Sequence, residues 1–463
     1  MNGREGLSPS LPLWCSVPVA AVLCLFIAYR LLRTRTWPER YLIIACSLRY
    51  LVSAFHDFTY RLAPGGLSYI ALVSIGLVAL GALTLDKRRL FIGAFLPVIV
   101  ICVLMLASGV LNHDPKSALE PIVRNAFFIV IAVAVWQTVD VAGPQALTRL
   151  LVVFVQPIIF QVLSIALHVA KAGESDGSVS YIGGYNHEQV FSLILASCFV
   201  VATFASRISR WAKLAISGLS IVGIGLANYR TTILGMVPLL IVQLFTAVPR
   251  AVPLQQRGLV RSAMLALAVC AAAGAIAVDP TRFSDIAKVA THGTGLIKPP
   301  HEFSADDRRV LSGRIYIWSS YLYAYNEATP TQKVFGTGPD AWAEQFRFYA
   351  HNTLISYLYE LGVLGVAAIL LLWGTMLSIA WHVPGTMRAQ VLGAHASFFL
   401  LNMATMPHWQ IEGNILYGLI CGYTLALARP GRPAGRAQPR LRQAPYEPEA
   451  SRGSPSAPSM TSQ

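Results

Sequence analysis

The stretch FIGAFLPVIVICVLMLASGVL, residues Phe91–Leu111, contains no charged side chain. Because a helix rises by about 1.5 Å per residue, roughly 20 apolar residues are needed to cross about 30 Å of hydrocarbon. Phe91–Leu111 meets this requirement. The stretch therefore predicts a transmembrane helix, and we use it as the template for reading the rest of the chain.

Similar apolar runs recur along most of the chain, which is 55% hydrophobic and only 13% charged. This composition excludes a water-soluble globular protein. Two candidates are weaker: Tyr41–Phe55, which is short and contains Arg49, and Leu214–Ala227. With these included, we predict an all-α polytopic integral membrane protein of about 12 to 13 transmembrane helices. The stronger runs are Leu11–Leu32, Leu67–Leu85, Phe91–Leu111, Ile122–Val139, Leu147–Val169, Val190–Ser206, Thr231–Val248, Leu259–Val278, Thr353–Ala380, Val391–Met406 and Ile411–Ala428.

If the runs cross the membrane in turn, the loops on one side carry many more Lys and Arg residues than the loops on the other side. Basic clusters such as Arg30–Arg40, Lys87–Arg89 and Arg207–Lys213 fall on one side, whereas the short loops of the other side hold few basic residues. Positively charged loops mark the cytoplasmic side of a membrane protein. The long loop Asp279–Ala350 is therefore predicted to lie outside, with the N-terminus outside and the C-terminus inside.

This topology divides the chain into four parts. We predict an N-terminal transmembrane bundle of about ten spans at residues 1–278 and a large outer loop at 279–350. About three further spans occupy 351–428. Residues 429–463 are rich in Pro, Arg, Ser and Gln, a composition typical of a disordered cytoplasmic tail.

The sequence predicts neither a metal site nor a cofactor. The seven cysteines lie in apolar runs without metal-ligand spacing. The net charge of +14 is explained by topology and by attraction to membrane lipids, so no nucleic-acid partner is expected.

The second half of the outer loop has the pattern of an amphipathic helix. In RRVLSGRIYIWSSYLYAY, residues Arg308–Tyr325, apolar side chains recur at spacings of three and four: Leu311, Ile315, Trp318 and Leu322. Its many Tyr and Trp residues suit the headgroup level of a membrane. We predict that this helix lies along the outer surface.

Three segments in order resemble the O-antigen ligase and polymerase superfamily of bacterial envelope enzymes. They are NYRTT at Asn228–Thr232, SGRIYIW at Ser312–Trp318, and AHNTLISYLYELGVLG at Ala350–Gly365. The single large outer loop between the last two also fits that family. With the hydropathy pattern, the resemblance covers the chain from about Tyr181 to Leu425.

The resemblance implies a GT-C-like glycan transferase of the bacterial inner membrane whose active site faces the periplasm. Its donor would be an undecaprenyl diphosphate-linked glycan, and its acceptor a saccharide or lipid A-core hydroxyl. Other envelope polysaccharide machinery would be its possible partner. Carried over by position, Arg230 and Arg314 would bind the diphosphate and His351 would be the catalytic base.

Elementary chemistry favours the same three residues. A guanidinium binds phosphate oxygens through paired hydrogen bonds and stabilises charge on a departing diphosphate. A sugar hydroxyl is a weak nucleophile, and histidine, with an unperturbed pKa of about 6.5, is a suitable base near neutral pH. The glycosyl phosphate is already activated, and attack opposite the leaving group would invert the anomeric centre.

Each of the three residues also has a structural interpretation. Arg230 can extend to the membrane interface from a helix end, and Arg314 can be a solvated charge on the loop helix. His351 with Asn352 can simply cap the helix that follows.

Secondary candidates lie near other apolar runs. Arg124 and Arg49 could extend a path for anions, or could pair with a carbonyl or carboxylate in the bundle. Asn186 and His187, within YIGGYNHE, could line the acceptor side or form a plain helix start. Glu360 could orient its neighbours, or mark a bend together with Gly362 and Gly365.

Two alternative functions remain at this point. A polymerase of O-antigen or exopolysaccharide would use the same chemistry and the same motifs as a ligase. A transporter or flippase of lipid-linked saccharide belongs to a different class, and it would place ionisable residues near the middle of the membrane. This sequence instead gathers them near one surface.

Overall fold

A computed structural model describes residues 9–64, 66–172, 179–247, 252–266, 296–305 and 307–428. The predicted tail at 429–463 lies outside the described residues. So do most of the predicted span Leu259–Val278 and residues 279–295 of the outer loop.

The first part of the chain is helical, with one short hairpin formed by β1 (Lys171–Ala172) and β2 (Val179–Ser180). Among the 3-10 turns that join or extend its helices are η1 (Gly93–Phe95), η2 (Pro115–Ala118) and η3 (Leu151–Phe154). The helices are α1 (Leu13–Arg33), α2 (Trp37–Ala54), α3 (His56–Thr59), α4 (Tyr69–Thr84), α5 (Lys87–Leu90), α6 (Leu96–Leu111), α7 (Leu119–Ala142), α8 (Gln145–Leu150), α9 (Val155–Ala166), α10 (Glu188–Phe204), α11 (Arg210–Leu226) and α12 (Arg230–Ala247).

The second part is also helical. The 3-10 turns are η5 (Leu254–Gln256), η7 (Pro300–Glu302), η8 (Asp307–Gly313) and η9 (Pro407–Trp409). The helices are α15 (Arg314–Glu327), α16 (Pro330–Phe335), α17 (Trp342–Gln345), α18 (Thr353–Trp381), α19 (Gly385–Ala404) and α20 (Ile411–Leu427). The prediction of an all-α fold is therefore confirmed for the described residues.

Within the part of the chain that the structure describes, five helical segments are long and apolar enough to cross a membrane: Leu13–Arg33, Gly93–Leu111, Pro115–Ala142, Gln145–Ala166 and Thr353–Trp381. Four shorter apolar helices are Tyr69–Thr84, Glu188–Phe204, Arg230–Thr246 and Ile411–Leu427. On α1, large apolar side chains face outward, including Trp14, Leu25 and Leu32, which are 73%, 72% and 82% exposed. Such a surface is unfavourable in water and suits contact with lipid.

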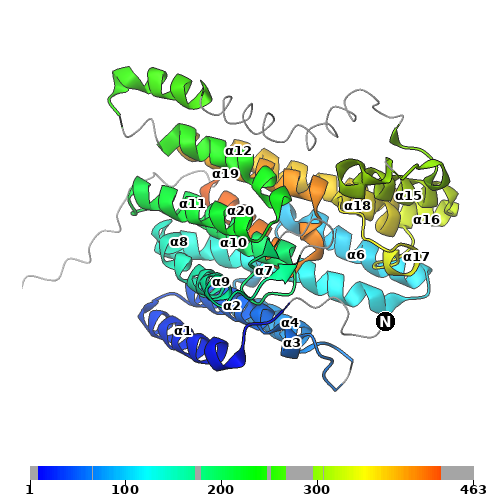
Figure 1. The fold of residues 1–463 in the computed structure, drawn as a ribbon, viewed down its shortest axis with the longest axis horizontal. Helices are drawn as coiled ribbons and strands as arrows, with labels where there is room; N and C mark the ends of the chain where they lie inside the picture. The colour runs from blue at the N-terminus through cyan, green and yellow to red at the C-terminus, as the bar shows by residue number, and fades with distance from the viewer. Residues whose placement is uncertain are drawn as a thin grey trace, which may run out of the picture. The chain divides into compact units, whose positions relative to one another are not determined.

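Helix α20 lies at the centre of the core. Every residue from Ile411 to Leu425 is buried, as expected for a mostly apolar helix that is surrounded by others. It packs against α7, where the rings of Phe128 and Tyr417 stack at 5.3 Å, and against α10, where Phe204 and Tyr423 stack at 4.4 Å. Most of the helices around this core run side by side in Figure 1.

The prediction of one amphipathic helix at Arg308–Tyr325 was partly wrong. The helix begins only at Arg314, because Gly313 has a φ of +81° and separates it from the 3-10 turn η8. Within α15 the buried residues are Ile315, Ser319 and Tyr321, so the predicted apolar stripe is buried only at Ile315. Helices α15 and α16 pack on α18, and α17 lies close by at the same end of the helices (Figure 1).

Helix α18 is interrupted at Gly362, whose φ of +67° and ψ of −166° are open in practice only to glycine. The break frees the carbonyls of Tyr359 and Glu360. The loop after α16 supplies the missing donors: Thr337 N–H donates to Tyr359 O at 2.9 Å, and Gly338 N–H to Glu360 O at 3.2 Å. The loop is thereby fixed to the first part of α18.

Candidate functional site

His351 lies in the turn that precedes α18. Its φ of +52° is unusual for a residue with a side chain, and such strain is often found at functional sites. The side chain is half-buried, and its Nδ1 has no hydrogen-bond partner among the described residues. A buried nitrogen without a protein partner is available to a ligand or to water.

Asn352 caps α18. Its Oδ1 accepts hydrogen bonds from the N–H groups of Leu354 and Ile355 at 2.9 and 3.3 Å, and its Nδ2 donates to Met403 O at 3.2 Å. Such a cap holds the start of the helix and therefore the position of the residue before it. Asn352 thus positions the turn that carries His351.

Helix α15 holds the same turn from the other side. Trp318 Nε1 donates to Ala350 O at 2.9 Å, and the Tyr321 hydroxyl donates to Phe348 O at 3.1 Å. The SGRIYIW and AHN segments, which are separated by more than 30 residues in the sequence, are therefore in direct contact.

Arg314 connects these two segments to the third. Its Nη2 donates to Thr231 Oγ1 at 3.0 Å, and Thr231 follows Arg230 directly. The guanidinium is half-buried, and burial lowers the pKa of Arg314, while Tyr229 and Tyr349 act in the opposite direction. An arginine remains charged at neutral pH despite such a shift.

Arg230 is the first residue of α12, and its side chain is exposed. Within the described part of the chain it forms no ion pair. The structure thus places Arg230 next to the residue that Arg314 contacts, with its guanidinium open to a ligand.

His351 shares an electrostatic environment with Arg314 and His187. Burial lowers the pKa of His351 to about 4, with smaller contributions in the same direction from Arg314 and then His187. The imidazole is therefore neutral at pH 7, which is the form that accepts a proton.

The segment around Asn186 and His187 leads into α10. His187 Nδ1 accepts the N–H of Gln189 at 3.0 Å and so caps this helix, as in the simpler of the two interpretations. Asn186 precedes it in the loop. Glu188, the first residue of α10, pairs with Lys171 at 3.0 Å, so its charge is balanced near the site.

Sequence reasoning missed Tyr349 and Gln189. The Tyr349 ring lies 4.0 Å from the His351 ring, and its hydroxyl donates to the buried Gln189 Oε1 at 3.1 Å. Burial raises the pKa of Tyr349 to about 12, so the hydroxyl stays protonated. The position of Tyr349 two residues before His351 was the available signal, but nothing in the sequence pointed to its partner.

The remaining candidates have structural partners. Arg49 is buried and pairs with Glu412 at 3.0 Å, and Ser53 donates to the same carboxylate at 2.9 Å. Arg124 pairs with Glu120 one helical turn away. For both arginines, the carboxylate-pairing interpretation describes the structure.

Glu360 is buried and fixes the loop that follows α16. Its carboxylate accepts from Ser356 Oγ at 2.6 Å and from the backbone N–H of Asp340 at 2.8 Å. Together with the break at Gly362, this contact confirms the predicted bend. Glu360 therefore orients the loop. Among the described residues, it makes no contact with His351.

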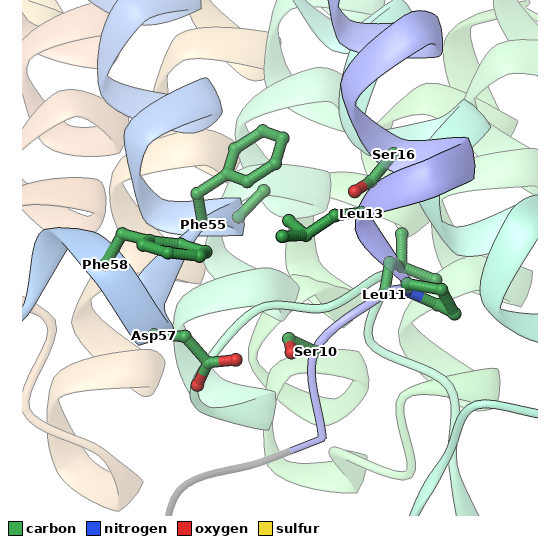
Figure 2. A pocket seen from close by; sticks show the side chains of 9 residues that line it. Ser10, Leu11, Leu13, Ser16, Phe55, Asp57 and Phe58 are labelled. Atoms are coloured by element: carbon green, nitrogen blue, oxygen red, sulfur yellow. The ribbon is translucent and has the colours of Figure 1, made fainter.

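A pocket of about 270 Å³ lies between the start of α1 and the end of α2. Figure 2 shows Phe55, Phe58 and Leu13 around it, with Asp57 and Ser10 at its lower side. None of Arg230, Arg314 and His351 lines this pocket. The candidate site is thus an assembly of loop and helix ends that is separate from this pocket.

Comparison with known proteins gives no family: no family model and no curated protein matches this chain. Among the described residues, no group of three or more His, Cys, Asp and Glu side chains could hold a metal ion.

Proposed function

We propose that this chain is a membrane glycan transferase of the O-antigen ligase type. It would move a saccharide from undecaprenyl diphosphate to an acceptor hydroxyl on the periplasmic face of a bacterial inner membrane. The protein would then be a GT-C-like bundle of about 12 to 13 spans. In the predicted topology, the site would face outward beneath the loop.

One observation carries this proposal: the contact of Arg314 with Thr231, beside Arg230, on a helix that also holds the turn before His351. Helix α15 is thereby bonded both to the residue after Arg230 and to the residue before His351. The two arginines and the neutral histidine are the groups needed to bind a diphosphate and to accept a proton.

In the proposed reaction, Arg230 and Arg314 bind the diphosphate oxygens. The acceptor hydroxyl attacks the anomeric carbon of the donor, and His351 takes the hydroxyl proton. A glycosidic bond forms, the bond from the anomeric carbon to the phosphate oxygen breaks, and undecaprenyl diphosphate leaves with the electron pair. The arginines stabilise the charge on the leaving group, and attack from the opposite side inverts the anomeric centre.

Donor binding should also change the pKa of the proposed base, His351. In the free protein His351 has a pKa of about 4, partly because of Arg314. A diphosphate bound at Arg314 brings negative charge to the same place, and negative charge favours the protonated imidazole. The pKa of His351 should therefore rise in the complex, toward the range where a base is most effective.

The test is transfer by purified protein in lipid from an undecaprenyl diphosphate-linked oligosaccharide. Arg230→Ala, Arg314→Ala and His351→Ala are compared with the parent protein. Arg308→Ala is the matched control, because Arg308 is an exposed arginine of the same loop that stacks on Tyr316. We expect His351→Ala to lower turnover by about 10²- to 10⁴-fold.

The products separate the related functions. A single addition to a lipid A-core acceptor indicates a ligase, whereas a ladder of sizes indicates a polymerase. Equal turnover in the parent and in all folded variants would refute the proposed site. Movement of the lipid across the bilayer without any transfer would favour a flippase.

A further inference from the structure

Helix α1 is the least enclosed of the five segments of membrane-spanning length, with 17% of its apolar window buried. Between α1 and α2 lies a groove of about 220 Å³. Apart from Ser47, Gln156 and Cys24, its walls are aliphatic. The lining residues are Leu23, Cys24, Ile27, Ala28, Leu31, Ile44, Ser47, Leu48, Leu51 and Gln156.

The groove is elongated along the helix axes. On α1, Leu23, Ile27 and Leu31 follow at spacings of four, so they form one stripe on the helix surface. Ile44, Leu48 and Leu51 form the facing stripe on α2. At about 1.5 Å per residue, the stripe on α1 is about 12 Å long, which suits an extended hydrocarbon chain.

Arg40 is not among the residues that line the groove, but it lies on α2 beyond Ile44, the first lining residue of that helix. Arg40 lies four positions before Ile44 and so continues the stripe on α2 beyond the apolar part. Arg40 Nε donates to Thr34 O at 2.9 Å, which fixes the guanidinium across the turn that joins α1 to α2. The terminal nitrogens Nη1 and Nη2 make no hydrogen bond to the described residues.

The turn around Arg40 is strongly basic. It also contains Arg30, Arg33 and Arg35, and the one carboxylate between residues 30 and 40 is Glu39. Glu39 is already neutralised, because Arg149 bonds both of its carboxylate oxygens at 2.5 and 2.7 Å. The positive charge of this turn is therefore not balanced by the turn's own acidic group.

We propose that the groove binds an anionic diacyl phospholipid. One acyl chain lies between the two apolar stripes, and the phosphate lies against the free nitrogens of Arg40. A guanidinium matches the geometry of a phosphate, and nearby arginines favour an anionic over a zwitterionic headgroup. This lipid site is separate from the proposed transfer reaction and does not depend on it.

The test measures lipids retained by purified protein from vesicles of phosphatidylethanolamine and phosphatidylglycerol, counted by native mass spectrometry. Phosphatidylglycerol should be retained in preference, and Arg40→Gln should reduce its retention by about fivefold. Ile27→Trp should fill the groove and reduce retention without a change in charge. Arg88→Gln is the matched control, an exposed arginine on α5 in another basic loop, and it should behave as the parent does.

Three results would overturn the proposal. Equal losses in Arg40→Gln and Arg88→Gln would mean that surface charge alone attracts the lipid. Full retention by a correctly folded Ile27→Trp variant would mean that no chain occupies the groove. Displacement of phosphatidylglycerol by an equal amount of undecaprenyl phosphate would mean that the groove takes a polyprenyl carrier instead.

Discussion

Arg49 is buried and Arg314 is half-buried, and the two differ in what balances their charge. Arg49 is paired with Glu412, whose carboxylate also accepts from Ser53. Arg314 donates to the neutral hydroxyl of Thr231, and no carboxylate of the described chain lies within ion-pair distance of it. A paired guanidinium joins two helices, whereas an unbalanced one has capacity to hold an anion. The comparison predicts a structural role for Arg49 and a binding role for Arg314.

Breaking the pair should have the largest effect on stability. Arg49→Met leaves the Glu412 carboxylate buried without its cation, and we expect a loss of about 3–5 kcal/mol in the free energy of unfolding. Transfer per folded molecule should be little changed. Thermal unfolding in detergent measures this, with Arg61→Met, at an exposed arginine, as the control. The double variant Arg49→Met/Glu412→Leu should recover most of the stability, and failure to do so would show that the pair is not the cause.

Removing Arg314, whose charge no carboxylate balances, should lower activity and leave stability nearly unchanged. Arg314→Ala should lower turnover by about 10²- to 10³-fold, the usual effect of losing one preorganised donor to developing charge. Its unfolding temperature should stay near that of the parent. Arg314→Lys should recover only part of the rate, because an ammonium lacks the paired geometry of a guanidinium. A large loss of stability with normal turnover would reverse the roles assigned to the two arginines.

The pH dependence of kcat/KM sharpens the comparison. Protonated His351 cannot act as a base, and its pKa in the free protein is about 4, so kcat/KM should fall only as the pH drops toward 4. Arg314 holds this pKa down, so in Arg314→Ala the fall should begin at higher pH. Kinetics between pH 4 and 8 measure the shift, using the residual rate of the variant. An unchanged profile would show that Arg314 does not act on His351.

Tyr349 should give the smallest effect. Tyr349→Phe keeps the ring against His351 but loses the hydrogen bond to Gln189, worth about 0.5–1.5 kcal/mol. We expect a decrease in turnover of at most about tenfold, whereas Tyr349→Ala also removes the ring contact and should lower it further. Rates of both variants at saturating donor measure the difference. Equal rates in the two would mean that the ring has no part in placing His351.

The helices were predictable because length and hydropathy are local properties of a sequence. The run at Phe91–Leu111 corresponds to α6 with its preceding turn, and Thr353–Ala380 corresponds to α18. The start of α15 was not predicted correctly, because the left-handed conformation of Gly313 depends on its surroundings. The number of spans and their orientation remain predictions.

For the candidate site, the sequence predicted which residues belong to it but not the contacts that they make. His351 and Arg314 came from the resemblance of their motifs, and the structure places their segments in contact. The partner of Arg49 was not predictable, because Glu412 is far away in the sequence and comes within reach only in the folded chain. The role of Gln189 beside Tyr349 was missed for the same reason.

The interruption of α18 at Gly362 has a consequence for how this protein could be re-engineered or could diversify. The residues before the break are bonded to the loop after α16 through Thr337, Gly338 and Asp340. Residues 314–361 therefore carry both the donors and the acceptors of these bonds, between two glycines with positive φ. A chimaera cut at Gly313 and Gly362 keeps these bonds, whereas a cut at His351 separates donors from acceptors and leaves both halves incomplete.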